Sequence, residues 1–125
     1  MTVLKAHAIL EDAVLECRQR NVNTPEVTEA LDFLEPHIRP TWLIPQYRHA
    51  LHRHGDQGYH REAQQQVLRP SFEGIRNSVR GLLRTRLERL GRQFATARDM
   101  KIKEEIERLA AEHDKLKEPW QFVAK

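Results

Sequence analysis

The sequence contains very little cysteine and no long apolar run. Cys17 is the one cysteine among 125 residues, so no disulfide can form within the chain. The same count excludes zinc sites built from four cysteines, or from two cysteines and two histidines. No stretch approaches the ~20 apolar residues that a membrane-spanning helix needs, and the first residues lack the pattern of a signal peptide. These absences predict a cytoplasmic protein with no membrane partner.

Catalytic signatures are missing as well. The sequence has no GxSxG motif, no P-loop, no GxGxxG loop and no set of kinase motifs. Cys17 falls on the apolar face of an expected helix beside acidic neighbours, which raises the pKa of a thiol. We therefore expect Cys17 to pack rather than react, and we expect a non-enzymatic protein that needs no cofactor.

Apolar residues recur at helical spacing along most of the chain. Thr2 is placed to cap a first helix that runs to about Arg20, and Thr24 followed by Pro25 is typical of the start of a second. A third, short helix is expected over residues 45–54.

The middle of the chain predicts an interrupted helix. Gly55 and Gly58 frame a loop, and a fourth helix is expected over residues 59–68. Pro70 is expected to stop this helix, because proline lacks the backbone N–H and its ring clashes with the preceding turn. Ser71 is then placed to cap the next segment.

The C-terminal half has the strongest helical pattern, over residues 72–95 and 99–118. The sequence leaves open whether these segments form one helix or two, although their apolar faces differ by about 120°, which favours a break near residues 96–99. We predict an all-α protein, a small bundle of four to six helices with a long C-terminal helix or helical hairpin. A single domain is expected over residues 1–118, with a short tail over residues 119–125.

The net charge of +3 hides a strong segregation. Residues 1–35 carry three basic and seven acidic groups, residues 36–100 carry twelve and five, and residues 101–125 carry six of each. All twelve bases of the middle block are arginine, and no lysine occurs between Lys5 and Lys101. Arginine makes planar, bidentate contacts to phosphate and carboxylate, so this block indicates an anionic partner. The alternative is a GC-rich genome that favours arginine codons, although residues 101–125 use five lysines and one arginine.

Several of these arginines share one edge of the apolar stripe between residues 69 and 98. Like charges four residues apart destabilise an isolated helix by a few tenths of a kcal/mol per pair, so something must offset the repulsion. Nucleic-acid phosphate, an acidic partner or the acidic first third of the chain can do so. Our leading hypothesis is a nucleic-acid-binding or ribonucleoprotein accessory module. The phosphate contacts would come from Arg69, Arg76, Arg80, Arg84 and Arg98.

A ridge of small residues lies beside these arginines on the same helix, formed by Gly74, Ser78, Gly81 and Thr85. Glycine in a helix interior is up to about 1 kcal/mol less favourable than alanine, so its use here indicates a packing need. We expect a neighbouring element to approach the helix closely along this ridge.

The last helical segment supports a first alternative function. Its narrow seam follows the steps 4, 3, 4 and 3, which is the heptad spacing of a coiled coil, and two aromatic residues come after it. The seam consists of Ile102, Ile106, Leu109, His113 and Leu116. This pattern is typical of a protein–protein adaptor or a homo-oligomeric scaffold. The residues expected to meet the partner are Ile102, Ile106, Leu109, Leu116, Trp120 and Phe122.

Four histidines occur between residues 49 and 60, but no metal-specific spacing is present and the interleaved arginines repel a cation, so we expect no metal site. The same stretch resembles the HEPN family of all-α ribonucleases, whose signature is arginine followed after four to six residues by histidine. Arg48 precedes His54 in this way, and Arg53 precedes His60. The resemblance implies a second alternative, a ribonuclease in which arginine and histidine act together on the RNA backbone, usually across a dimer.

Overall fold

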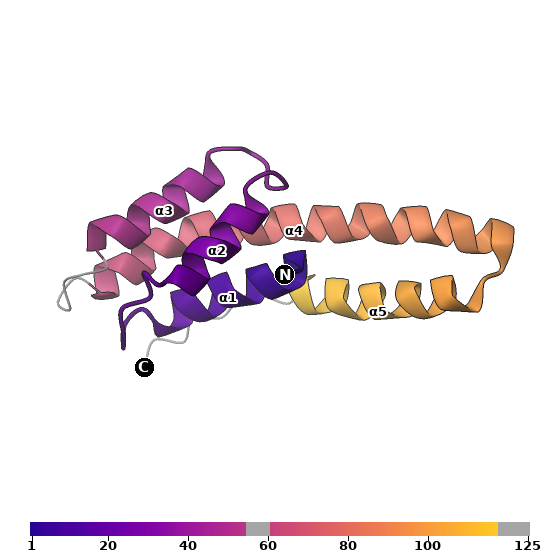
Figure 1. Ribbon diagram of the computed structural model, residues 1–125, viewed down its shortest axis with the longest axis horizontal. Helices are drawn as coiled ribbons and strands as arrows, with labels where there is room; N and C mark the ends of the chain where they lie inside the picture. Colours follow the sequence, from indigo (N-terminus) through magenta and orange to yellow (C-terminus); the bar gives the residue numbers. More distant parts are fainter. Residues whose placement is uncertain (55–60, 118–125) are drawn as a thin grey trace. The chain divides into compact units, whose positions relative to one another are not determined.

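The computed structural model describes residues 1–54 and 61–117, and their regular structure is entirely helical (Figure 1). This confirms the all-α prediction, including the long C-terminal hairpin. No helix in this described part is both long enough and apolar enough to cross a membrane. The helices are α1 (Val3–Glu16), α2 (Pro25–Leu34), α3 (Leu43–His54), α4 (Arg61–Ala97) and α5 (Met100–Lys117).

The chain divides into two compact units, Met1–Val79 and Arg80–Lys125, and the boundary falls within α4. The first unit contains α1, α2, α3 and the first half of α4. The second contains the rest of α4 and α5, which run antiparallel as a hairpin (Figure 1). A single domain over residues 1–118 stays a prediction, and the tail over 119–125 lies outside the described residues.

The expected helix starts are confirmed by their caps. The Thr2 hydroxyl accepts the Lys5 N–H at 3.1 Å, and the Thr24 hydroxyl accepts the Val27 N–H at 3.3 Å. Pro25 occupies the first turn of α2, where a missing N–H has no consequence. The first helix ends at Glu16, four residues earlier than expected, and turns follow it.

The first unit is held together by buried apolar side chains and by polar side chains that satisfy backbone carbonyls of other helices. The Tyr47 hydroxyl donates to the Leu10 carbonyl at 2.9 Å, and burial raises the pKa of Tyr47, so the proton stays on the oxygen. The Gln65 amide of α4 donates to the Val14 carbonyl of α1 at 2.8 Å. The largest fully buried residues of this unit are Leu10, Leu31, Leu34, Ile38, Ile44, Tyr47, Leu51, Gln64, Leu68, Phe72 and Ile75.

The expected interruption at Pro70 is wrong, because α4 passes through this residue without a break. Pro70 has no N–H, so the Gln66 carbonyl loses its hydrogen bond within the helix. Both residues are exposed, so water can solvate that carbonyl and the helix can continue. Ser71 does not cap a new helix. It is fully buried, and its hydroxyl donates back to the Leu68 carbonyl at 3.0 Å.

The question of one helix or two is settled by the turn between α4 and α5. Arg98 has a positive φ of 52°, which ends α4, and its N–H donates to the Phe94 carbonyl at 2.7 Å. Asp99 then caps α5, since its side chain accepts the Lys101 N–H at 2.8 Å. The break lies where the apolar faces of the two segments predicted it.

Candidate nucleic-acid interface

Arg76 lies on the part of α4 that belongs to the first unit, and its charge acts on two residues of α1. Burial, and then the nearby Arg76 charge, lowers the pKa of His7 to about 4. Burial raises the pKa of Glu11, while Arg76 opposes that rise. His7 is 3% exposed and its ring lies 4.9 Å from the ring of Phe72. The charge of the half-buried Arg76 therefore acts on residues inside the first unit.

Two other arginines of the expected face are either paired or half-buried. The Arg69 Nε donates to a Glu73 carboxylate oxygen at 3.2 Å, a surface pair one helical turn apart that contributes about 0.3–0.5 kcal/mol. Arg80 is half-buried. Of the five arginines in the predicted face, this leaves Arg84 and Arg98 as exposed residues with no ion pair to any described side chain.

The second half of α4 carries further exposed arginines that the sequence analysis did not select. Arg89 and Arg92 are exposed and make no ion pair within the described part of the chain. With Arg84 they fall in a sector of about 140° at 100° per residue. They lie away from the edge of the apolar stripe on which the predicted face was placed. Their signal in the sequence is the charge of the segment, since residues 80–97 contain five arginines and one acidic residue, Glu88.

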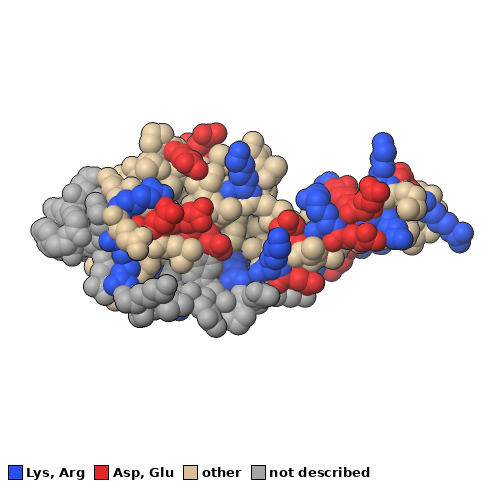
Figure 2. Space-filling model, turned by 90° about the horizontal axis from the view of Figure 1, so that it is seen from below, with Lys and Arg blue, Asp and Glu red and all other residues tan. Residues whose placement is uncertain are grey.

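The facing helix of the hairpin has a different charge pattern. α5 carries five basic and five acidic residues, and Figure 2 shows both signs intermingled on this side of the hairpin. The guanidinium of Arg86 donates to Glu105, with the Nε atom at 3.2 Å. Glu105 of α5 therefore engages Arg86 of α4, whereas Arg84, Arg89 and Arg92 are exposed and make no ion pair with a described side chain.

A hollow of about 470 Å³ lies at the turn end of the hairpin. Ile102 of α5 forms one wall and is half-buried. The last turns of α4 form the rest, through the exposed side chains of Arg92, Gln93, Thr96 and Ala97. The Thr96 hydroxyl donates to the Arg92 carbonyl at 3.1 Å. The lining of the hollow thus combines apolar side chains, Ala97 and Ile102, with the guanidinium of Arg92 and the amide of Gln93.

The partner seam expected on α5 is largely covered within this chain. Leu109 and Leu116 are 3% and 8% exposed, and Ile102 and Ile106 are half-buried. Trp120 and Phe122 lie outside the described residues. Partner binding through this seam stays a prediction, although its two leucines are not available on the surface described here.

The residues behind the HEPN resemblance are described only in part. Arg48 is held by α2, since its guanidinium contacts Asp32 at 2.7 Å and Glu35 at 3.6 Å. The side chains of Arg53 and His54, and all of His60, lie outside the described part. The ribonuclease alternative stays a prediction, and no group of potential metal ligands occurs among the side chains that the structure describes.

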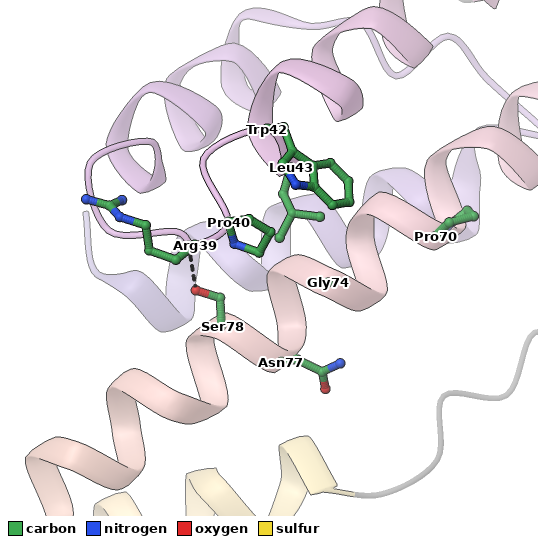
Figure 3. Close-up of a pocket in the computed structure, with 8 residues that line it drawn as sticks. All are labelled: Arg39, Pro40, Trp42, Leu43, Pro70, Gly74, Asn77 and Ser78. Atoms are coloured by element: carbon green, nitrogen blue, oxygen red, sulfur yellow. Dashed lines mark hydrogen bonds between the residues drawn. The ribbon is translucent and has the colours of Figure 1, made fainter.

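A second hollow, of about 430 Å³, lies in the first unit where the chain enters α3 (Figure 3). Leu43 points onto α4 at Gly74, where an added Cβ would come within 2.5 Å of a Leu43 methyl. The Ser78 hydroxyl accepts the Arg39 N–H at 3.1 Å. This half of the small-residue ridge accommodates a neighbouring segment, as expected, and leaves Trp42 58% exposed beside it.

The other half of the ridge has no such neighbour. A Cβ at Gly81 would meet nothing within 4 Å, and the Thr85 hydroxyl donates to the Gly81 carbonyl at 3.0 Å. The packing explanation therefore holds for Gly74 and not for Gly81.

Comparison of the chain with protein-family models, with curated proteins and with solved structures finds no match.

Proposed function

We propose that this protein is a non-enzymatic nucleic-acid-binding module, of the kind that acts as an accessory subunit in ribonucleoproteins. The observation that supports the proposal is the set of exposed arginines Arg84, Arg89 and Arg92, which make no ion pair with any described residue. Residues 80–97 have a net charge of +4, from five arginines and one glutamate. Such a concentration on one helix favours a polyanionic partner.

Phosphate contacts account for the choice of arginine. The guanidinium group binds phosphate oxygens in a bidentate, planar geometry, and each neutralised phosphate releases counterions into solution. These contacts do not read base sequence. Arg98, exposed at the hairpin turn, extends the same set. Arg69, Arg76 and Arg80 contribute charge along the same helix, while their side chains are paired or half-buried.

The test is a titration of labelled RNA, single-stranded DNA and duplex DNA, followed by fluorescence anisotropy at about 50 and 200 mM salt. The variant Arg84→Ala/Arg89→Ala/Arg92→Ala is expected to bind at least tenfold more weakly at low salt. The slope of log K against log salt should fall in magnitude by about two on single strands and by about 2.7 on duplex DNA, because three phosphate contacts are lost.

The matched control removes the same number of charges from the neutral helix α5. Lys101→Ala/Lys103→Ala/Lys115→Ala changes the net charge by the same three units, at exposed positions. It should reduce the affinity much less than the arginine variant. Equal losses in the two variants would show that net charge alone is responsible, and no binding by the parent at 50 mM salt would rule out the proposal.

Trp42 favours a second candidate, a protein–protein adaptor or homo-oligomer. Exposed tryptophans beside hollows are typical anchors of protein interfaces, and Trp42 has this position. Light scattering over a range of protein concentrations tests the homo-oligomeric form. A mass that rises with concentration in the parent, and does not rise in Trp42→Ala, would support it, whereas a constant monomer mass would exclude it.

A further inference from the structure

We propose that the hollow at the hairpin turn receives an unstacked base of a single-stranded nucleic acid, so that the partner is single-stranded rather than duplex. The inference rests on the proposed function and names the partner of the same surface. The hollow is the one lined by Arg92, Gln93, Thr96, Ala97 and Ile102.

The walls of the hollow match the chemistry of a base. Ala97 and Ile102 give an apolar surface for the face of the ring, and the planar guanidinium of Arg92 can stack on it, as arginine does on unpaired bases. The Gln93 amide both donates and accepts, which suits the polar edge of a base. The Thr96 hydroxyl proton is used by the Arg92 carbonyl, so its oxygen remains an acceptor.

The size and the surroundings fit the same occupant. The hollow is open, since four of its five lining side chains are exposed, and its volume of about 470 Å³ is ample for one base. Arg89 lies about one helical turn before Arg92 and Gln93 and is exposed, so its guanidinium can meet the phosphate next to a base in the hollow. Arg84 lies five residues before Arg89 and about 140° around the helix from it, so it would meet a more distant part of the strand.

A duplex cannot use the hollow, because its bases are stacked on one another and its exposed edges do not present a ring face. Single strands present unstacked bases, and stacking on a protein surface is tolerant of sequence. The expected preference is therefore for single-stranded RNA or DNA over duplex, with little dependence on base sequence.

The experiment measures the affinities of a single-stranded oligonucleotide, its duplex and an abasic single strand of equal length, for the parent and three variants. Ala97→Leu fills the hollow without changing charge. Ala95→Leu is its control, since Ala95 is exposed two residues away and does not line the hollow. Arg92→Lys keeps the positive charge and removes the planar group.

We expect Ala97→Leu and Arg92→Lys to weaken single-strand binding by about tenfold, in line with the loss of one stacked base. Duplex binding should be unchanged by Ala97→Leu, and Ala95→Leu should resemble the parent. The abasic strand should bind the parent as weakly as the normal strand binds Ala97→Leu. Equal parent affinities for normal and abasic strands, or an unchanged Ala97→Leu, would overturn the inference. The proposed function would survive that result if the triple arginine variant still lost binding to every polyanion.

Discussion

Two glycines of α4 have opposite surroundings, and replacing each by alanine tests the packing of the first unit. Both substitutions favour the helix by about 0.5–1 kcal/mol, because alanine loses less backbone entropy than glycine. At Gly81 the new methyl group meets nothing within 4 Å, so the whole gain should appear. At Gly74 the new Cβ would lie 2.5 Å from one Leu43 methyl and 3.1 Å from the other.

Leu43 is 3% exposed, so its displacement disturbs packed atoms. Overpacking of this kind typically costs about 1–3 kcal/mol. We therefore expect Gly81→Ala to be about 0.5–1 kcal/mol more stable than the parent, and Gly74→Ala to be about 1–3 kcal/mol less stable than Gly81→Ala. Urea denaturation followed by circular dichroism measures both free energies of unfolding, provided that the m-values agree.

A double-mutant cycle identifies the cause. Leu43→Ala removes the methyl groups that the new Cβ would meet, so Gly74→Ala in that background should become as favourable as Gly81→Ala. If Gly74→Ala is as stabilising as Gly81→Ala in the parent background, Leu43 does not pack on α4 as described and the reasoning fails.

Three further predictions concern other positions. Burial and Arg76 lower the pKa of His7 from 6.5 to about 4, so between these values the unfolded chain binds a proton that the folded chain does not. The free energy of unfolding should therefore fall by about 3 kcal/mol from pH 7 to pH 4, and the raised pKa of Glu11 partly opposes this fall. In urea denaturation at several pH values, His7→Phe should show a smaller fall than the parent. Burial raises the pKa of Cys17 from 9.0 to about 11, which leaves about a hundredfold less thiolate, so Ellman's reagent should label it far more slowly in buffer than in denaturant. Arg98→Gly should raise the melting temperature, because glycine avoids the cost of about 1 kcal/mol that a side chain incurs at a φ of 52°. The same substitution should weaken binding to nucleic acid. An unchanged melting temperature would contradict the stability prediction.

The local features of this fold were predictable from sequence, because each depends on neighbours within one helical turn. The caps at Thr2 and Thr24, and the break between α4 and α5, are of this type. The prediction at Pro70 was wrong because it relied on a local signal alone. A proline is a local signal for the end of a helix, but whether the helix continues depends on whether the freed carbonyl faces water, and this is set by the packing of the whole helix.

The candidate site was predictable only in part, since the sequence places arginines on a face without saying what covers that face. Arg76 acts on His7, 69 residues away in the chain, and Arg86 pairs with Glu105 of the facing helix. No spacing rule finds such partners. The neutral composition of α5 could not reveal them either, because its acidic residues are equally suited to water or to any of several arginines.

Arginine therefore has two different uses along α4. Before residue 80 its charges are directed to partners in the first unit, where Arg76 acts on α1 and Arg69 pairs with Glu73. Beyond it, Arg84, Arg89 and Arg92 remain exposed, and the spacing of three residues between Arg89 and Arg92 places like charges side by side at a cost of a few tenths of a kcal/mol. Glu88 is the one acidic residue among residues 80–97, and Arg86 pairs with Glu105 of α5. We propose that an external anion offsets the remaining repulsion, and the phosphates of a nucleic-acid strand would supply it.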